Sequence, residues 1–320
     1  MYDDCYIGSI GYKSLVPKKE TLSCDNLYDI ASLTKVVVIV TLIAKLVEKN
    51  IISYQDSVKT YLKEFKYPDI TIFDLLTHTS GLNADLGDKK ILSKDELIKQ
   101  IFAQEKILET GSKVVYSDIG YILLGLIIER IYAKPLDVVA KEEIFEHLNM
   151  LDTTYNPLDI LRCAPTEVTA ERGVVLGIVH DEKACSLNGV AGHAGVFTTV
   201  SDLMNFEKMI LNKGLFNNKR ILSEESINLL FSPFVKDDKN RIRSFSWFVG
   251  ENKLVTLGNS KTISFSGFTG PSISIDLENN IGIILLTNRV HPTRENENFI
   301  KERANISKEI YKILNIKNIN

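Results

Sequence analysis

The feature that most constrains the fold of this 320-residue sequence is a change of hydrophobic pattern at Pro233. Upstream, over residues 54–232, apolar residues recur mainly at helical spacing. Capping residues stand where the segments begin: Ser93 with Glu96, Ser117, and Ser201 with Asp202. Downstream, short runs rich in β-formers predict strands over residues 244–249, 253–257, 262–268, 272–275 and 281–287. Turn sequences such as Gly258-Asn259 separate them, a pattern typical of antiparallel hairpins. The chain then ends in an amphipathic helical pattern over residues 297–314.

The front of the chain predicts a further strand and a buried helix. Residues 5–12 are rich in β-formers, and residues 36–49 are apolar nearly all round, as in a helix packed inside a core. Because strands occur at both ends of the chain and helices between them, we expect an α/β (α+β) fold. Its antiparallel sheet would be flanked by helices and would carry an inserted, mainly helical domain. The expected sheet domain is discontinuous, residues 1–60 and 233–320, and the inserted domain spans residues 61–232.

Composition argues against several classes of protein. A formal net charge of −3 lacks the basic excess that nucleic-acid binding usually needs. The four cysteines are scattered without a Cys-x-x-Cys pair, so we expect neither a disulfide framework nor a zinc site. The longest apolar run, residues 36–46, is too short to span a bilayer, and no signal peptide is visible. The sequence as given therefore predicts a cytoplasmic protein, or an exported or cell-envelope one if its natural N-terminus is longer.

Ser32 and Lys35 are the first candidates for chemistry, at the point where the buried helix is expected to begin. Their spacing puts both side chains on one helical face, about one turn apart. A serine hydroxyl becomes a good nucleophile when a nearby base removes its proton, and a desolvated lysine amine can help. The free N–H groups of a helix start also favour negative charge there. The spacing alone equally fits a capping serine beside a solvated lysine.

Tyr116 and a segment rich in small residues, residues 264–270, are the next candidates. A lysine ammonium can lower the pKa of a neighbouring tyrosine, which can then act as base toward a serine and as acid toward a leaving group. The alternative is a packed aromatic residue before a helix cap. A strand edge with little side-chain bulk lets a substrate pair alongside it, and one of its N–H groups could join that of Ser32 in an oxyanion hole. The alternative is a tight β-hairpin.

Four segments, in order and spacing, resemble the serine β-lactamase-like family, and more narrowly its class C and penicillin-binding-protein-like branch. The resemblance extends over nearly the whole chain, from about residue 11 to residue 314. The segments are Asp29–Lys35, Leu75–Leu82, Tyr116–Tyr121 and Gly192–Phe197.

The resemblance implies an active site in the cleft between the two domains. Ser32 would be acylated, and Lys35 and Tyr116 would handle its proton. Asp118 stands where the family often has Asn, and its carboxylate would orient the Lys35 ammonium without donating a hydrogen bond to substrate. Family members also carry a strand and a helix before the segment near Tyr6, so one sheet edge is expected to be incomplete.

The third motif differs from that of the family. Phe265, Ser266 and Gly267 stand where the family has Lys/His-Thr/Ser-Gly, whose first residue helps to bind a substrate carboxylate. A phenyl ring offers no charge and no donor to a carboxylate, which argues against efficient turnover of penicillins or of D-Ala-D-Ala peptides and against a dedicated β-lactamase. The resemblance still implies substrate binding by these three residues and Phe268, with oxyanion donors from the N–H groups of Ser32 and Phe268.

The histidines of the matching segments are expected to be scaffold rather than catalytic residues. His78 and His193 lie in stretches that resemble structural turns of the family. His180 and Asp181 precede a run that resembles members linked to muropeptide handling, and they are expected to line the cleft.

The leading hypothesis is a serine hydrolase that acts through an acyl-enzyme on an ester or amide. It would be a penicillin-binding or D,D-peptidase-like enzyme, an esterase or an amidase of peptidoglycan fragments. Its substrate would be a small molecule or a peptidoglycan-derived one, and no metal or organic cofactor is required. The alternatives are a penicillin-binding sensor or non-catalytic binding protein, and a class C-type β-lactamase. The oligomeric state is left open.

Overall fold

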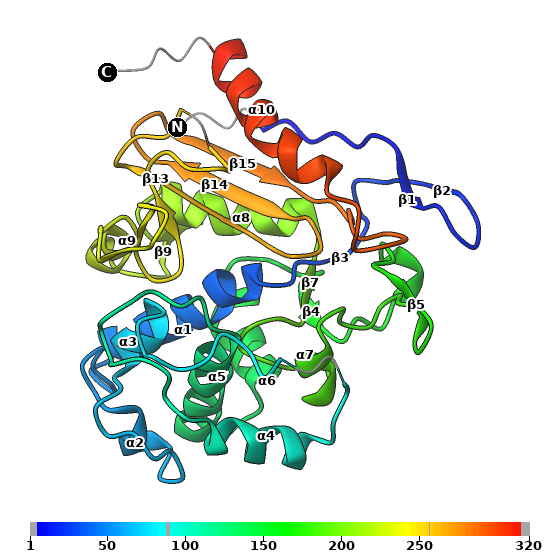
Figure 1. Cartoon of the computed structure of the whole chain (residues 1–320). Helices are drawn as coiled ribbons and strands as arrows, with labels where there is room; N and C mark the ends of the chain where they lie inside the picture. Colours follow the sequence, from blue (N-terminus) through cyan, green and yellow to red (C-terminus); the bar gives the residue numbers. More distant parts are fainter. Residues whose placement is uncertain (1–4, 88–89, 256, 315–320) are drawn as a thin grey trace.

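An antiparallel six-stranded sheet forms the upper layer of the computed structural model, which describes residues 5–87, 90–255 and 257–314 (Figure 1). Its strand order follows the sequence, from β10 at one edge to β15 at the other. The α/β fold with an antiparallel sheet flanked by helices is confirmed. The strands are β10 (Val235–Lys236), β11 (Ile242–Arg243), β12 (Phe248–Val249), β13 (Thr262–Ser266), β14 (Ser272–Asp276) and β15 (Ile281–Leu285).

One strand expected in this region does not form. Residues 253–255 lie in the loop between β12 and β13, and residue 256 lies outside the described residues. Asn252 explains the difference, because its side chain accepts a hydrogen bond from the Leu254 N–H at 2.9 Å and donates one to the Gly250 carbonyl at 2.8 Å. Such local bonds offer the backbone an alternative to strand pairing.

Two helices cover the two faces of the sheet (Figure 1). On one face, α8 (Val200–Leu211) packs against β14 and β15. On the other, α10 (Asn298–Ile313) buries Tyr311 in a small cluster with Ile283 of β15. Ser201 and Asp202 were expected to cap α8, but Thr199 is its cap, because the Thr199 hydroxyl accepts the Asp202 N–H.

The lower part of the molecule is mainly helical (Figure 1). Most of its helices begin where a side chain accepts one of the first N–H groups, as in the capping box of Ser93 and Glu96. The buried segment after Ser32 is π-helical over Lys35–Val40 and continues as an α-helix. The helices here are α1 (Thr41–Glu48), α2 (Val58–Tyr61), α3 (Ile72–Leu76), α4 (Lys94–Ala103), α5 (Asp118–Tyr132), α6 (Leu136–Ala140), α7 (Glu182–Ser186) and, nearer the sheet, α9 (Glu224–Leu230).

Short strands connect distant parts of the chain. In a three-stranded sheet, β7 lies between β3, just before Ser32, and β4. The prediction of a strand over residues 5–12 is wrong in position. Among the described residues, the first strand is β1, which begins at Tyr12 and pairs with β2. The short strands are β1 (Tyr12–Ser14), β2 (Glu20–Thr21), β3 (Tyr28–Asp29), β4 (Thr154–Tyr155), β5 (Val168–Thr169), β6 (Gly173–Val174), β7 (Val196–Thr198), β8 (Leu215–Phe216) and β9 (Lys219–Arg220).

The division into domains 1–60 plus 233–320 and 61–232 stays a prediction. Elements on both sides of the proposed boundaries pack together, since β3 pairs with β7 and α8 packs on the sheet. Within the described ranges, no helix combines the length and the apolar character needed to cross a membrane.

Candidate active site

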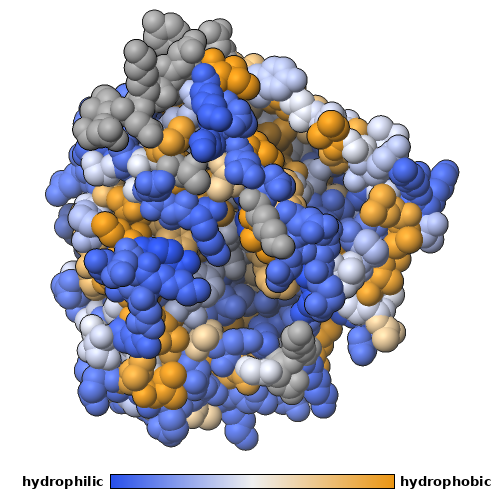
Figure 2. Space-filling view, turned by 45° about the horizontal axis from the view of Figure 1, so that its top comes forward, coloured by the Kyte–Doolittle hydropathy of each residue, from blue (hydrophilic) through white to orange (hydrophobic). Residues whose placement is uncertain are grey.

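A cavity of about 620 Å³ collects the candidate residues. Its walls come from β13, from the ends of α5 and α7, and from α10, and hydrophilic side chains surround a hollow in one face of the molecule (Figure 2). Seven of the eight residues singled out in the sequence line this cavity, namely Ser32, Tyr116, Asp118, Phe265, Ser266, Gly267 and Phe268. The eighth, Lys35, has no exposed surface and is hydrogen-bonded to Ser32.

A tight turn after β3 presents Ser32. Ala31, just before it, has a φ of 45°, in the left-handed region that side chains rarely adopt. The buried Asp29 carboxylate holds the turn, because it accepts the Ala31 N–H at 2.8 Å and the His180 N–H at 2.7 Å. Burial raises the pKa of Asp29. The position of Ser32 is thus tied to the loop before α7.

Lys35 connects Ser32 to α5. Its Nζ lies 3.0 Å from Ser32 Oγ, 2.7 Å from Asp118 Oδ1 and 3.0 Å from the His193 carbonyl oxygen. Burial lowers the pKa of Lys35, but its interactions with Asp118 and Tyr116 outweigh burial and leave it above its ordinary value. Lys35 is therefore an ammonium that donates to Ser32 Oγ. The ammonium form favours a role for Lys35 in orienting Ser32. A neutral lysine amine would instead accept the proton of the serine.

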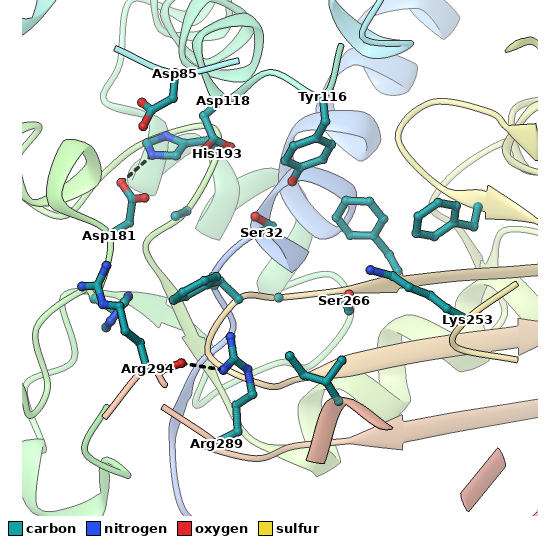
Figure 3. A pocket seen from close by; sticks show the side chains of 18 of the residues that line it. Ser32, Asp85, Tyr116, Asp118, Asp181, His193, Lys253, Ser266, Arg289 and Arg294 are labelled. Carbon is teal, nitrogen blue, oxygen red and sulfur yellow. Dashed lines mark hydrogen bonds and ion pairs between the residues drawn. The ribbon is translucent and has the colours of Figure 1, made fainter. Parts of the chain in front are cut away.

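Tyr116 stands over Ser32, with its oxygen directed into the cavity (Figure 3). The Lys35 ammonium lies 5.0 Å from the centre of its ring. His78 fixes this position, since its ring lies 4.6 Å from that of Tyr116 and its Nδ1 accepts the Ser117 N–H at 3.1 Å. Burial, Arg243 and Lys35 all lower the pKa of His78, so it stays neutral and keeps the lone pair that this bond needs.

His193 stands on the opposite side of Ser32 from Tyr116 (Figure 3). Its Nε2 lies 2.7 Å from Asp181 Oδ1. Burial raises the pKa of Asp181, but His193 and a backbone N–H outweigh burial and hold it well below its usual range. As expected, His180 and Asp181 line the cavity.

The end of β13 packs against the turn that carries Ser32. A Cβ on Gly267 would lie 2.4 Å from the Ile30 carbonyl oxygen, and the Thr269 hydroxyl donates to the Asp29 carbonyl at 2.7 Å. Only glycine permits this approach at position 267. Among the described residues, neither the N–H of Ser32 nor that of Phe268 has a hydrogen-bond acceptor, so both are free to bind a substrate oxygen.

Phe265 belongs to an aromatic wall. Its ring is 3 % exposed and lies 6.3 Å from Trp247, 6.4 Å from Phe248 and 6.4 Å from Tyr116, centre to centre. The residue therefore gives the cavity an apolar surface at this point and holds Tyr116 from one side.

Seven lysine and arginine side chains that line the cavity were not predicted from the sequence, and three of them come from separate parts of the sheet region. Lys253 lies between β12 and β13, Arg289 follows β15, and Arg303 lies on α10. No motif marks them, because only the tertiary fold brings them together. Among the described residues, no group of three or more His, Cys, Asp or Glu side chains is arranged to hold a metal ion.

Comparison with known proteins identifies similar chains. The sequence model of the family described as Beta-lactamase matches residues 6–305. The chain is 30 % identical to an N-acetylmuramyl-L-alanine amidase of Bacillus subtilis, over 91 % of this chain and 73 % of the relative. It is also 30 % identical to a putative D-alanyl-D-alanine carboxypeptidase of Salmonella agona, over 83 % and 70 %. A penicillin-binding protein from Bacillus halodurans has a similar fold, with a TM-score of 0.72 at 19 % identity, over 90 % of this chain and 89 % of that one.

Proposed function

The chain belongs to the Beta-lactamase family, and from that premise we propose that it is a serine hydrolase that forms an acyl-enzyme at Ser32. The observation that carries the proposal is the contact of 3.0 Å between Lys35 Nζ and Ser32 Oγ, with Asp118 2.7 Å from the same ammonium. This arrangement holds the serine oxygen at the cavity and keeps a positive charge where a phenolate at Tyr116 would need it.

In the proposed reaction, Ser32 Oγ attacks the carbonyl carbon of an amide or ester while the Tyr116 phenolate takes its proton. The carbonyl oxygen becomes negatively charged and accepts hydrogen bonds from the N–H groups of Ser32 and Phe268. As the bond to the leaving group breaks, Tyr116 returns the proton to it. Water then attacks the acyl-enzyme in the same way and restores Ser32. Lys35 stays an ammonium throughout, oriented by Asp118.

We propose a fragment of peptidoglycan as the substrate class. The amidase and the carboxypeptidase to which the chain is similar are both named for cleaving an amide bond, one next to N-acetylmuramic acid and the other between D-alanines. The apolar ring of Phe265 offers no partner to the carboxylate that a penicillin or a D-Ala-D-Ala peptide would present at the third motif, so it favours the amide next to N-acetylmuramic acid over both.

The test compares the wild type with Ser32→Ala on nitrophenyl esters, a chromogenic cephalosporin, a D-Ala-D-Ala peptide and an N-acetylmuramyl peptide. We expect Ser32→Ala to lose at least about 1000-fold in kcat/KM on every substrate that the wild type hydrolyses, since the nucleophile is gone. Ser112→Ala, at an exposed serine outside the cavity, should keep wild-type rates.

Activity that survives in Ser32→Ala would contradict the nucleophile. A fluorescent penicillin that labels Ser32 without turnover would instead favour the sensor. Efficient hydrolysis of the cephalosporin would favour the class C-type β-lactamase.

A further inference from the structure

His180 contacts both segments that carry the proposed oxyanion donors. It stands just before α7 and is only 5 % exposed. Its N–H donates to Asp29 Oδ2 at 2.7 Å, and its carbonyl accepts a hydrogen bond from Arg172 Nη1 at 2.8 Å. Asp29 also holds the turn that presents Ser32, because it accepts the Ala31 N–H. The backbone of His180 is therefore fixed relative to the nucleophile.

Glu167 fixes the orientation of the His180 ring. The Nε2 of His180 lies 3.0 Å from Glu167 Oε2, and Arg294 binds the same carboxylate, with its Nη2 2.6 Å from Oε2. Burial raises the pKa of Glu167, but the hydrogen bonds of Arg294 and His180 outweigh burial and lower it to about 2. Glu167 is therefore a carboxylate that accepts a hydrogen bond from His180 Nε2, and this bond sets the direction in which the ring points.

The oriented ring of His180 supports Phe268. The two rings stack, with centres 5.5 Å apart and an angle of 27° between their planes. The Phe268 side chain is 49 % exposed, so the protein core does not hold it. The Arg289 guanidinium lies 4.9 Å from the centre of the same ring. Because aromatic pairs prefer a defined geometry, His180 restricts the movement of Phe268.

The position of Phe268 matters for the reaction because its N–H is one of the two proposed oxyanion donors. The other donor, on Ser32, comes from a segment distant in sequence, and the two must be placed to match an oxygen that gains charge in the transition state. The bond from the Thr269 hydroxyl to the Asp29 carbonyl joins the two segments through the backbone. His180 adds a second connection, from Asp29 to the side chain of Phe268.

We propose that His180 is a positioning residue, whose ring holds Phe268 so that the N–H groups of Phe268 and Ser32 keep a fixed separation. The inference rests on the proposed function, which assigns these two N–H groups to the substrate oxygen. It goes beyond that function, because it gives a role in the reaction to a histidine that acts through another residue. The Nε2 of His180 is bonded to Glu167, so the ring contributes by its packing.

Two substitutions of His180 separate stacking from hydrogen bonding. His180→Gln can still donate to Glu167 but has no ring, and His180→Phe keeps a ring beside Phe268 but cannot bond to Glu167. On 4-nitrophenyl acetate we expect His180→Gln to lower kcat and kcat/KM by the same factor, roughly tenfold or more, because a misplaced donor weakens binding of the transition state alone. His180→Phe should stay within about threefold of the wild type, since the stack remains. In a Phe268→Ala background, His180→Gln should add no further loss.

A sulfur-containing substrate distinguishes positioning from a loss of folded protein. In the corresponding thiono ester, sulfur replaces the carbonyl oxygen, and sulfur is the weaker hydrogen-bond acceptor. The ratio of the rates on the two esters does not depend on how much of the protein is folded. We expect the wild type to prefer the oxygen ester, and His180→Gln to reduce this preference by roughly threefold or more. His147→Gln, at an exposed histidine outside the cavity, is the matched control and should keep the wild-type rates and ratio.

Equal losses in His180→Phe and His180→Gln would overturn the proposal, as would a full further loss from His180→Gln in the Phe268→Ala background. Either result would show that His180 does not act through the ring of Phe268. The failure of the proposed function looks different, because Ser32→Ala would then still hydrolyse the ester, and the role of His180 would fail with it. If hydrolysis depends on Ser32 but His180→Gln keeps the wild-type kcat and ratio, the positioning role alone fails.

Discussion

At the scale of single residues, Asp118 determines the charge state of the site. Its carboxylate lies 2.7 Å from the Nζ of Lys35, a lysine with no exposed surface. Burial alone would lower the pKa of Lys35 and favour a neutral amine, and the carboxylate reverses that balance. The ammonium form of Lys35 therefore depends chiefly on this carboxylate.

Asp118→Asn should bring the titration of Lys35 into the measurable range. Because the carboxylate raises the Lys35 pKa, its removal should lower that pKa by roughly 1–3 units, so activity should be lost at lower pH than in the wild type. The measurement is kcat/KM on a nitrophenyl ester between pH 6 and 11. Asp85→Asn removes a cavity carboxylate that pairs with Lys183 instead, and it should leave the alkaline limb in place. Identical profiles for Asp118→Asn and wild type would contradict the orienting role of Asp118.

At the scale of elements, the site depends on the close approach of the end of β13 to the turn after β3. The two segments are distant in sequence, yet Gly267 touches the Ile30 carbonyl and Thr269 bonds to the Asp29 carbonyl. This contact sets the distance between the N–H groups of Ser32 and Phe268. A shift of either segment would change the binding of a substrate oxygen.

Gly267→Ala should therefore damage both stability and activity. The added methyl carbon would lie 2.4 Å from the Ile30 carbonyl oxygen, so backbone must move. We expect the free energy of unfolding to fall by about 1–3 kcal/mol, as for overpacked cores, and kcat to fall with it. Denaturant unfolding and ester hydrolysis measure the two effects.

Gly120→Ala is the matched control for this prediction. In α5 the nearest atom to a Cβ at this position is 3.5 Å away, an ordinary contact. Alanine is also the better helix former, by about 1 kcal/mol, so this variant should be neutral or stabilised. Wild-type stability and activity in Gly267→Ala would show that the contact between the two segments has no importance.

Elements with local signals were predictable from the sequence, and those that depend on tertiary contacts were not. Capping residues gave α4 and α5 within a residue or two, because Ser93 and Ser117 satisfy N–H groups of their own helices. The strand expected over residues 253–257 failed, since the hydrogen bonds of Asn252 outweigh β-propensity there. The π-helical start of the buried helix at Lys35 had no signal in the apolar pattern.

At the scale of the whole molecule, sheet and helices share one hydrophobic core. A single cluster of buried residues reaches from Tyr28 through α5 to Ile275 of β14. The Ser-x-x-Lys spacing could be found from the sequence because its residues are neighbours on the chain. The cations Lys253, Arg289 and Arg303 could not, because they are far apart in sequence and only the tertiary fold brings them to one cavity.

A continuous core predicts one cooperative unfolding transition. Trp247, the single tryptophan of the chain, is completely buried beside β12 and reports on the sheet region by fluorescence, whereas far-UV circular dichroism reports mainly on the helices. We expect the two signals to give the same midpoint in urea, because neither part keeps its buried surface without the other. Separate midpoints would instead support residues 61–232 as an independent domain.

The π-helical segment Lys35–Val40 has a consequence for the evolution of the site. Each residue of an α-helix turns the chain by about 100°, and all six residues of this segment are buried. Loss of one of them would let the segment close into a regular helix and rotate the preceding turn by that angle. The Lys35 side chain would then point away from Asp118 on α5, and their ion pair would be lost. The π-helical turn thus fixes how the buried helix is rotated relative to Ser32, which must face the cavity. A substitution in this segment keeps that rotation, whereas a deletion changes it, so we expect substitutions to be tolerated more readily than deletions.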